Sequence, residues 1–155
     1  MKLRFVLPTL LLALGANAQL VTKPALTLEA AKKIAAAGET EARKNNWNVV
    51  IVIVDDGANL IYLQKMDDTQ IGSIDIAQGK ARTAVRMKRP TKALEDAVAA
   101  GRNVLLTLPG TTPLEGGIPL MVGGKIVGAI GVSGVQSNQD AQIAQAGAAV
   151  LAQMK

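Results

Sequence analysis

The feature that most constrains the fold is a run of apolar, mostly β-branched residues that ends in a turn signal. Residues 48–54 read Asn-Val-Val-Ile-Val-Ile-Val, a composition typical of a buried strand. Asp55-Asp56-Gly57 follows as a turn, and residues 59–66 form a second strand-like segment. Residues 48–66 are therefore predicted to form a β-hairpin, the basic unit of an antiparallel sheet.

A second hairpin is predicted near the C-terminus. Residues 118–122 and 125–132 are strand-like, and Gly123-Gly124 between them suits the positive φ angles of a type I′ turn. Residues 104–107 are predicted to be one further short strand. Helices are expected after Thr27, over residues 73–87, from Thr91 to Ala100, and from Ser137, with Thr27 and Thr91 as caps. This order predicts an α/β (α+β) fold with an antiparallel sheet and helices on one or both faces.

The N-terminus has the organisation of a secretory signal. Lys2 and Arg4 precede an apolar run over residues 5–14, and Ala16-Asn17-Ala18 offers a small-residue cleavage site. We predict a signal peptide over residues 1–18, an irregular lead-in over 19–26 and one domain over 27–155. Cleavage would lower the formal net charge from +5 to +3. A periplasmic or secreted protein that is not embedded in a membrane is expected.

Composition excludes several classes of site. The chain has no cysteine and no histidine, so disulfides, thiolate chemistry and the usual imidazole base, zinc ligand and haem ligand are absent. Only Phe5, Trp47 and Tyr62 are aromatic, so the core must consist of small and aliphatic side chains. No group of residues demands catalysis, and a binding protein is favoured over an enzyme.

Basic residues are concentrated in one short stretch without acidic residues, namely Lys80, Arg82, Arg86, Lys88, Arg89 and Lys92. Arg82, Arg86 and Arg89 have the spacing of one helix face. Such a face is either simply solvated or binds a small anionic ligand or an acidic protein surface. Nucleic acid is a poor fit, because export and the scarcity of stacking aromatics argue against it.

Two further groups of residues can be interpreted either as ligand sites or as structural features. Gly131-Val132-Ser133-Gly134 leads into the last helix, whose free N–H groups could bind a carboxylate or phosphate; alternatively, glycines in the strand relieve crowding against packed helices. Asp67, Asp68 and Asp75 could approach one another and bind a hard cation, or could act as helix-capping acids.

Several segments resemble the GlcG/HbpS family and together extend from about residue 26 to 152. The most specific segment is Gly128-Ala129-Ile130-Gly131-Val132-Ser133-Gly134 with Gln139-Asp140 downstream. Weaker matches are Val52–Asp55, Gly57–Leu60, Lys65–Asp67, Lys80–Ala84 and Gly117–Leu120. The resemblance implies profilin-like α/β/α layers with a five-stranded antiparallel sheet and association into homo-oligomers. Asp68, where a glycine is common, and the lack of histidine depart from the family pattern.

The resemblance also implies a ligand. Secreted members are similar to haem-binding proteins, some of them accessories of a sensor kinase and some described as haem-degrading. A threonine contacts haem in such relatives, and Thr83 or Thr111-Thr112 are the candidates here. Arg82, Arg86 or Lys80 would pair with the propionates. An iron ligand would have to come from Tyr62, a lysine or a methionine, the methionines being Met66, Met87 and Met121.

These observations leave three hypotheses. The leading hypothesis is a secreted, oligomeric haem-binding protein that acts either alone or with a sensor protein as its partner. The second is a protein or enzyme accessory that binds a small carboxylate or hydroxy acid, as in glycolate-type metabolism, with Gly131, Ser133 and Gly134 at the site. The third is an oligomeric scaffold without a small ligand.

Overall fold

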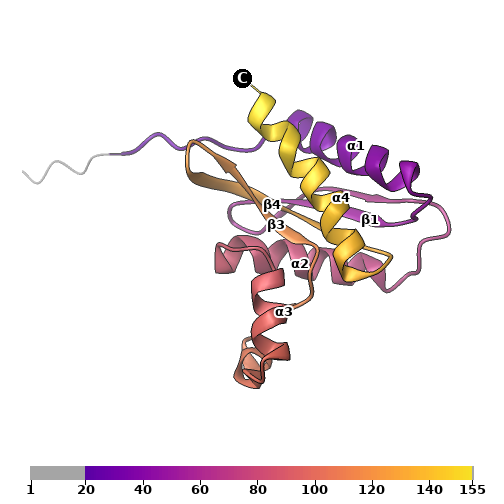
Figure 1. Cartoon of the computed structure of the whole chain (residues 1–155). Coiled ribbons are helices and arrows are strands. Elements are labelled where there is room, and N and C mark those ends of the chain that lie inside the picture. Colours follow the sequence, from indigo (N-terminus) through magenta and orange to yellow (C-terminus); the bar gives the residue numbers. More distant parts are fainter. Residues whose placement is uncertain (1–19, 155) are drawn as a thin grey trace, which may run out of the picture.

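The computed structural model describes residues 20–154, in which an antiparallel sheet of four strands lies between helices (Figure 1). The strands are paired in the order β2-β1-β4-β3. Their bounds are β1 (Val50–Asp55), β2 (Leu60–Lys65), β3 (Gly117–Val122) and β4 (Lys125–Ser133). The predicted signal peptide, residues 1–18, lies outside the described residues, and residues 20–27 form neither helix nor strand.

Both predicted hairpins are confirmed. In the β1–β2 turn, the Asp55 carboxylate accepts hydrogen bonds from the backbone N–H groups of Gly57 and Asn59, each at 2.8 Å. In the β3–β4 turn, Gly123 and Gly124 both have positive φ, as a type I′ turn requires. The residue types in the turns therefore determine both the β1–β2 and the β3–β4 connection.

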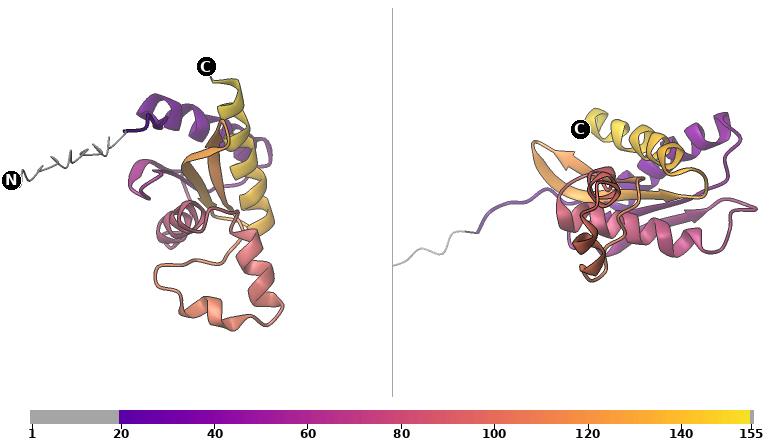
Figure 2. Two further views of the ribbon diagram at one scale, coloured as in Figure 1. Left: turned by 90° about the vertical axis from the view of Figure 1, so that its left-hand side faces the viewer. Right: turned by 60° about the horizontal axis from the view of Figure 1, so that its bottom comes forward.

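The prediction of a fifth strand was wrong. Residues 104–107 lie in η1 (Asn103–Thr107), a 3₁₀ helix that follows α3 (Lys92–Ala99). Its polar groups bond locally, since the Thr107 hydroxyl donates to the Val104 carbonyl at 2.8 Å. Figure 2 shows α3 and η1 as an arm that extends away from the sheet. A strand needs a neighbouring strand for its N–H and C=O groups, and the arm carries this segment away from any.

Helices cover both faces of the sheet (Figure 1). On one face lie α1 (Leu28–Lys44) and α4 (Ser137–Ala149), which η2 (Val150–Gln153) extends; on the other lies α2 (Ser73–Met87). The Thr27 hydroxyl accepts from the Ala30 N–H at 3.1 Å, which confirms this cap. The first face encloses the larger aliphatic side chains, such as Ile34, Ile51 and Ile143. No helix within residues 20–154 is both long and apolar enough to cross a membrane.

The face under α2 is built from smaller side chains. Ala77, Ala81 and Ala84 of the helix pack on Val52 and Ala129 of the sheet. Gly131 of β4 lies so close to α2 that a Cβ atom there would be 2.2 Å from the Ala77 carbonyl oxygen. The alternative that strand glycines relieve crowding is therefore confirmed at Gly131, and α2 is fixed close to the sheet.

The pairing of each edge strand with its inner neighbour contains an irregularity. The β1–β2 register shifts between Ile53 and Val54, and the β3–β4 register shifts between Leu120 and Met121. The edge strand β3 also contains Pro119, which has no N–H to donate. Pro119 therefore leaves the edge strand β3 one backbone donor short.

Candidate functional site

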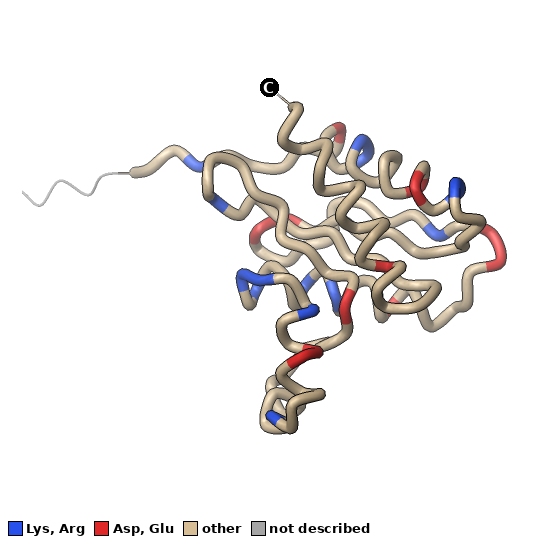
Figure 3. The backbone as a smooth tube through the Cα atoms, viewed as in Figure 1, with Lys and Arg blue, Asp and Glu red and all other residues tan. Residues whose placement is uncertain are grey.

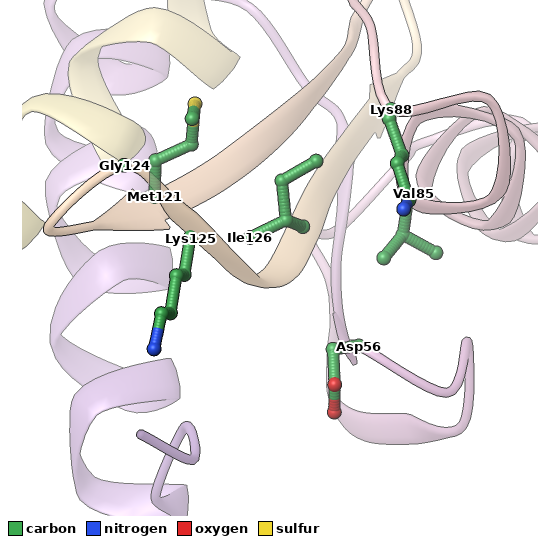
Figure 4. A pocket seen from close by; sticks show the side chains of 7 residues that line it. All are labelled: Asp56, Val85, Lys88, Met121, Gly124, Lys125 and Ile126. Carbon is green, nitrogen blue, oxygen red and sulfur yellow. The ribbon is translucent and has the colours of Figure 1, made fainter. Parts of the chain in front are cut away.

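A cleft of about 480 Å³ lies where the end of α2 meets the β3–β4 hairpin and the β1–β2 turn (Figure 4). We call it the lysine cleft; it is lined by Asp56, Val85, Lys88, Met121, Gly124, Lys125 and Ile126. Val85 and Ile126 also belong to or pack on the core under α2, so the apolar wall of the cleft is continuous with the folded core. Its volume lies within the range of sites that hold small molecules and cofactors.

Two lysines provide the positive charge of the cleft. Lys88 comes from the end of α2 and Lys125 from the start of β4, and Figure 4 shows them on either side of Ile126. Figure 3 shows further basic residues around the end of α2. An apolar wall between two ammonium groups suits a flat apolar ligand that carries carboxylates.

The backbone conformation of Lys88 is a second indication that the lysine cleft is a functional site. Lys88 is the C-cap of α2 and has left-handed angles, with φ of 52° and ψ of 38°. Glycine is the usual residue in this conformation, because a Cβ atom costs roughly 1–2 kcal/mol there. A lysine in this conformation is consistent with a role for its side chain, since strain of this kind clusters at functional sites.

Several predicted haem contacts lie together on another face of α2. The Thr83 hydroxyl accepts from the Thr112 N–H at 2.8 Å, and a Cβ at Gly110 would be 3.1 Å from an Arg86 nitrogen. The segment 110–112, with the half-buried Thr111, therefore runs along α2 beside Arg86. Thr83 itself is buried, so its hydroxyl fixes this loop and is not free for a ligand.

Arg82 and Arg86 remain available to solvent. Arg82 is half-buried and its guanidinium lies 3.4 Å from the Gln78 side-chain oxygen, while Arg86 is exposed. Neither forms an ion pair with the acidic residues of the described chain. The arginine face is therefore a second place where an anionic group could bind.

Lys80 does not belong to the basic surface, which corrects the prediction that it pairs with a propionate. Its side chain is 2% exposed, and its ammonium group donates to Asp140 at 2.7 Å and to the Val132 carbonyl at 3.0 Å. Burial raises the pKa of the Asp140 carboxyl above its ordinary value, while Lys80 opposes this shift. The pair joins α2, β4 and α4 inside the protein and is a structural element.

The predicted anion site at Gly131, Ser133 and Gly134 is also not formed. Gly131 faces α2, the Ser133 hydroxyl donates to Ser73 at 3.3 Å, and a Cβ at Gly134 would be 2.4 Å from the Asn48 carbonyl oxygen. The start of α4 is closed by its own side chains: Gln136 and Gln139 form a reciprocal capping box, and Asp140 accepts from the Val135 N–H at 3.2 Å. A carboxylate ligand would have to displace these groups.

The candidate iron ligands are separated by the sheet. Tyr62 packs against the core under α1 and α4, on the face opposite α2, and lies 3.4 Å from the Gln64 side chain. Met66 is buried in the same core. Met121 is 54% exposed and lines the lysine cleft, so it is the methionine candidate that shares a site with basic residues there.

The three aspartates of the predicted cation site do not assemble into one. Within residues 20–154, no group of three or more carboxylates is placed to hold a metal ion. Asp67 and Asp68 are exposed, and Asp68 has a positive φ, which aspartate tolerates in turns. Asp75 lies in the first turn of α2, where a negative charge favours the helix dipole. The alternative of helix-capping acids fits Asp75, whereas Asp67 and Asp68 lie in a turn.

Sequence reasoning missed Val85, Lys125 and Ile126 as residues that line a cleft. Lys125 is a single lysine after a tight turn, and Val85 is an apolar residue of α2 whose type does not suggest a site. The available signal was the Gly123-Gly124 turn, because the hairpin it makes projects Lys125 and Ile126 beside the end of α2.

The fold and the cleft define a class of small proteins that have one antiparallel sheet between helices and a basic cleft beside the helix on one face. Residues 26–149 match the family model described as "Haem degrading protein HbpS-like". The chain belongs to this HbpS-like family, which confirms the GlcG/HbpS resemblance.

Comparisons with individual relatives agree with this family assignment. The protein GlcG of Escherichia coli K12 is 50% identical over 112 residues, which cover 72% of this chain and 84% of GlcG. A double mutant of HbpS from Streptomyces reticuli is 35% identical, with a TM-score of 0.80 over 97% of this chain and 99% of that one. A crystal structure of a PduOC:heme complex is 30% identical, with a TM-score of 0.74 over 81% and 94% of the two chains.

Proposed function

We propose that this chain is a haem-binding protein and that the lysine cleft is its haem site. The observation that carries the proposal is the combination, in one cleft, of an apolar wall, two ammonium groups and a thioether. The family description and the haem complex of a relative support haem as the ligand class. Small carboxylates are less favoured, because the amide site predicted for them is closed by Gln136, Gln139 and Asp140.

The residues of the cleft fit the chemical parts of haem. Val85 and Ile126 offer apolar contact for the porphyrin, and Lys88 and Lys125 offer charge-assisted hydrogen bonds to the two propionates. Met121 supplies a thioether, an established type of axial iron ligand. Haem would bring a redox-active iron to the cleft, and the residues here would bind it and partly exclude water from it.

The test is a titration of the purified chain with hemin, followed by the shift of the Soret band. We expect a saturable shift in the parent protein. Two variants with the same charge change locate the site: Lys88→Glu/Lys125→Glu should weaken binding at least tenfold, whereas Arg82→Glu/Arg86→Glu should change it less than threefold. Met121→Leu should move the Soret maximum with a smaller change in affinity.

The outcomes distinguish an error in the ligand from an error in the location of the site. If the parent protein gives no saturable shift, haem binding is wrong. If the arginine variant loses binding and the lysine variant keeps it, the haem site is the arginine face beside Thr111.

We also propose that the chain forms a homo-oligomer through residues 103–114, which comprise η1 of the arm and the loop that follows it. Residues 103–114 contain no charged side chain. No residue of η1 is buried, and the apolar residues Val104, Leu106, Leu108 and Leu114 are 38–62% exposed. Exposed apolar surface of this kind is typical of association sites. Val104→Asp/Leu106→Asp should convert an oligomer to a monomer in sedimentation analysis; a parent protein that is already monomeric would contradict the proposal.

Export to the periplasm belongs to the same proposal and rests on the signal-like residues 1–18. Cell fractionation tests it, because an exported chain should appear in the periplasmic fraction shortened by about this segment. A full-length chain confined to the cytoplasm would refute it. A sensor partner remains a hypothesis for the exported protein.

A further inference from the structure

The irregular lead-in is fixed to the folded domain at two places. Leu26 packs against the core under α1 and α4, and Pro24, Ala25 and Leu26 line an apolar groove together with Val122 and Val127 of the β3–β4 hairpin. The lead-in therefore runs past the hairpin that forms one wall of the lysine cleft (Figure 1). Residues 24–26 are therefore held against the hairpin by apolar contacts.

Lys23 of the lead-in forms an ion pair with Asp56. Asp56 belongs to the β1–β2 turn and is the carboxylate that lines the lysine cleft. Its side chain is 27% exposed, whereas that of Lys23 is 60% exposed. The neighbouring Asp55 is occupied within the turn, where it accepts hydrogen bonds from Gly57 and Asn59. Lys23 thus connects the lead-in to the acidic residue of the cleft.

This contact matters for an anionic ligand. A free carboxylate at Asp56 would repel a carboxylate held by Lys88 or Lys125 in the same cleft and would compete for their ammonium groups. With Asp56 paired to Lys23, the two cleft lysines remain as uncompensated charges. We propose that Lys23 is a specificity-determining residue of the haem site: it neutralises Asp56 and so allows a dicarboxylate tetrapyrrole to bind. This inference rests on the proposed function of the cleft.

Hemin and its dimethyl ester, which lacks free carboxylates, test this role in the same spectroscopic titration. Lys23→Ala should weaken hemin binding about fivefold, the size expected for one partly screened charge interaction, and leave ester binding within twofold. Asp56→Asn should remove the repulsion, so Lys23→Ala/Asp56→Asn should bind hemin within twofold of the parent protein. Raising the salt concentration should reduce the effect of Lys23→Ala.

Lys32→Ala is the matched control, because Lys32 is also an exposed lysine in an ion pair, with Glu29 on α1. It should leave hemin binding unchanged. The inference is overturned if Lys23→Ala binds hemin like Lys32→Ala, if it weakens the ester equally, or if the added Asp56→Asn change does not restore binding. If the parent protein binds neither tetrapyrrole, the proposed function and this inference both fail; if it binds hemin and Lys23→Ala has no effect, only this inference fails.

Discussion

Removing one partner of the buried Lys80–Asp140 pair should destabilise the fold strongly. Asp140→Asn leaves the Lys80 ammonium group, 2% exposed, without its carboxylate, and a loss of this kind costs about 3–5 kcal/mol. In a domain of this size, 1 kcal/mol corresponds to roughly 4 °C in Tm. We therefore expect Tm to fall by about 10–20 °C.

The opposite variant adds a pH dependence. In Lys80→Met the Asp140 carboxyl stays buried, and burial already raises its pKa in the folded state. Because the ammonium group that lowered this pKa is gone, the folded-state pKa rises further above the unfolded value. The neutral carboxyl therefore makes its full contribution to the free energy of unfolding below the unfolded-state pKa. This contribution is lost as the pH rises through the folded-state pKa. Lys80→Met should be closer to the parent protein at pH 5 than at pH 8.

Urea unfolding followed by circular dichroism at these two pH values measures both effects. Lys80→Met/Asp140→Leu removes both charges and should lie within about 2 kcal/mol of the parent protein, because apolar replacement of a buried pair is often close to neutral. The reasoning is refuted if each single variant costs less than about 1 kcal/mol, or if the double variant costs the sum of the two.

Three further predictions concern the backbone and the turns. Lys88→Gly should raise the free energy of unfolding by about 0.5–1 kcal/mol, since glycine relieves the left-handed C-cap, yet weaken hemin binding; a loss of stability would contradict this. Gly131→Ala should cost about 1–3 kcal/mol or more through the clash with the Ala77 carbonyl, while Gly72→Ala, which has open space around its Cβ position, should be within about 0.5 kcal/mol of the parent protein. Hydrogen bonds, chiefly from Asn59, lower the pKa of Asp55, so Asp55 stabilises the fold above the unfolded-state pKa and stabilises it less as the pH falls through the folded-state pKa. The difference in free energy of unfolding between the parent protein and Asp55→Asn, measured in urea, should therefore shrink from pH 6 to pH 2. A constant difference would refute this prediction.

Local signals were sufficient for most of the fold. The apolar run that forms β1, the two turn sequences and the Thr27 cap of α1 each depend on residues close together in the chain, so their patterns could be interpreted directly. Residues 104–107 have the composition of a strand as well. Their 3₁₀ conformation depends on the arm carrying them away from the sheet, and no local pattern contains that information.

The candidate site was less predictable, because charge in a sequence does not reveal burial. Lys80 and Arg82 are two residues apart and were grouped together, yet one is buried and the other is half-buried at the surface of α2. The difference is due to Asp140, which lies 60 positions away along the chain. Tyr62 and Met121 likewise belong to one sheet but to opposite faces, which depends on strand order and register.

The irregular borders of the sheet limit how copies of this protein can meet. A shifted register in the pairing of each outer strand, together with a proline in β3, discourages the strand-by-strand stacking that leads to fibrils. The homo-oligomer proposed above would therefore form through side-chain contacts rather than through main-chain pairing. An assembly built in this way can be finite in size, and its geometry can be changed by substituting a few leucines and valines while the sheet stays intact.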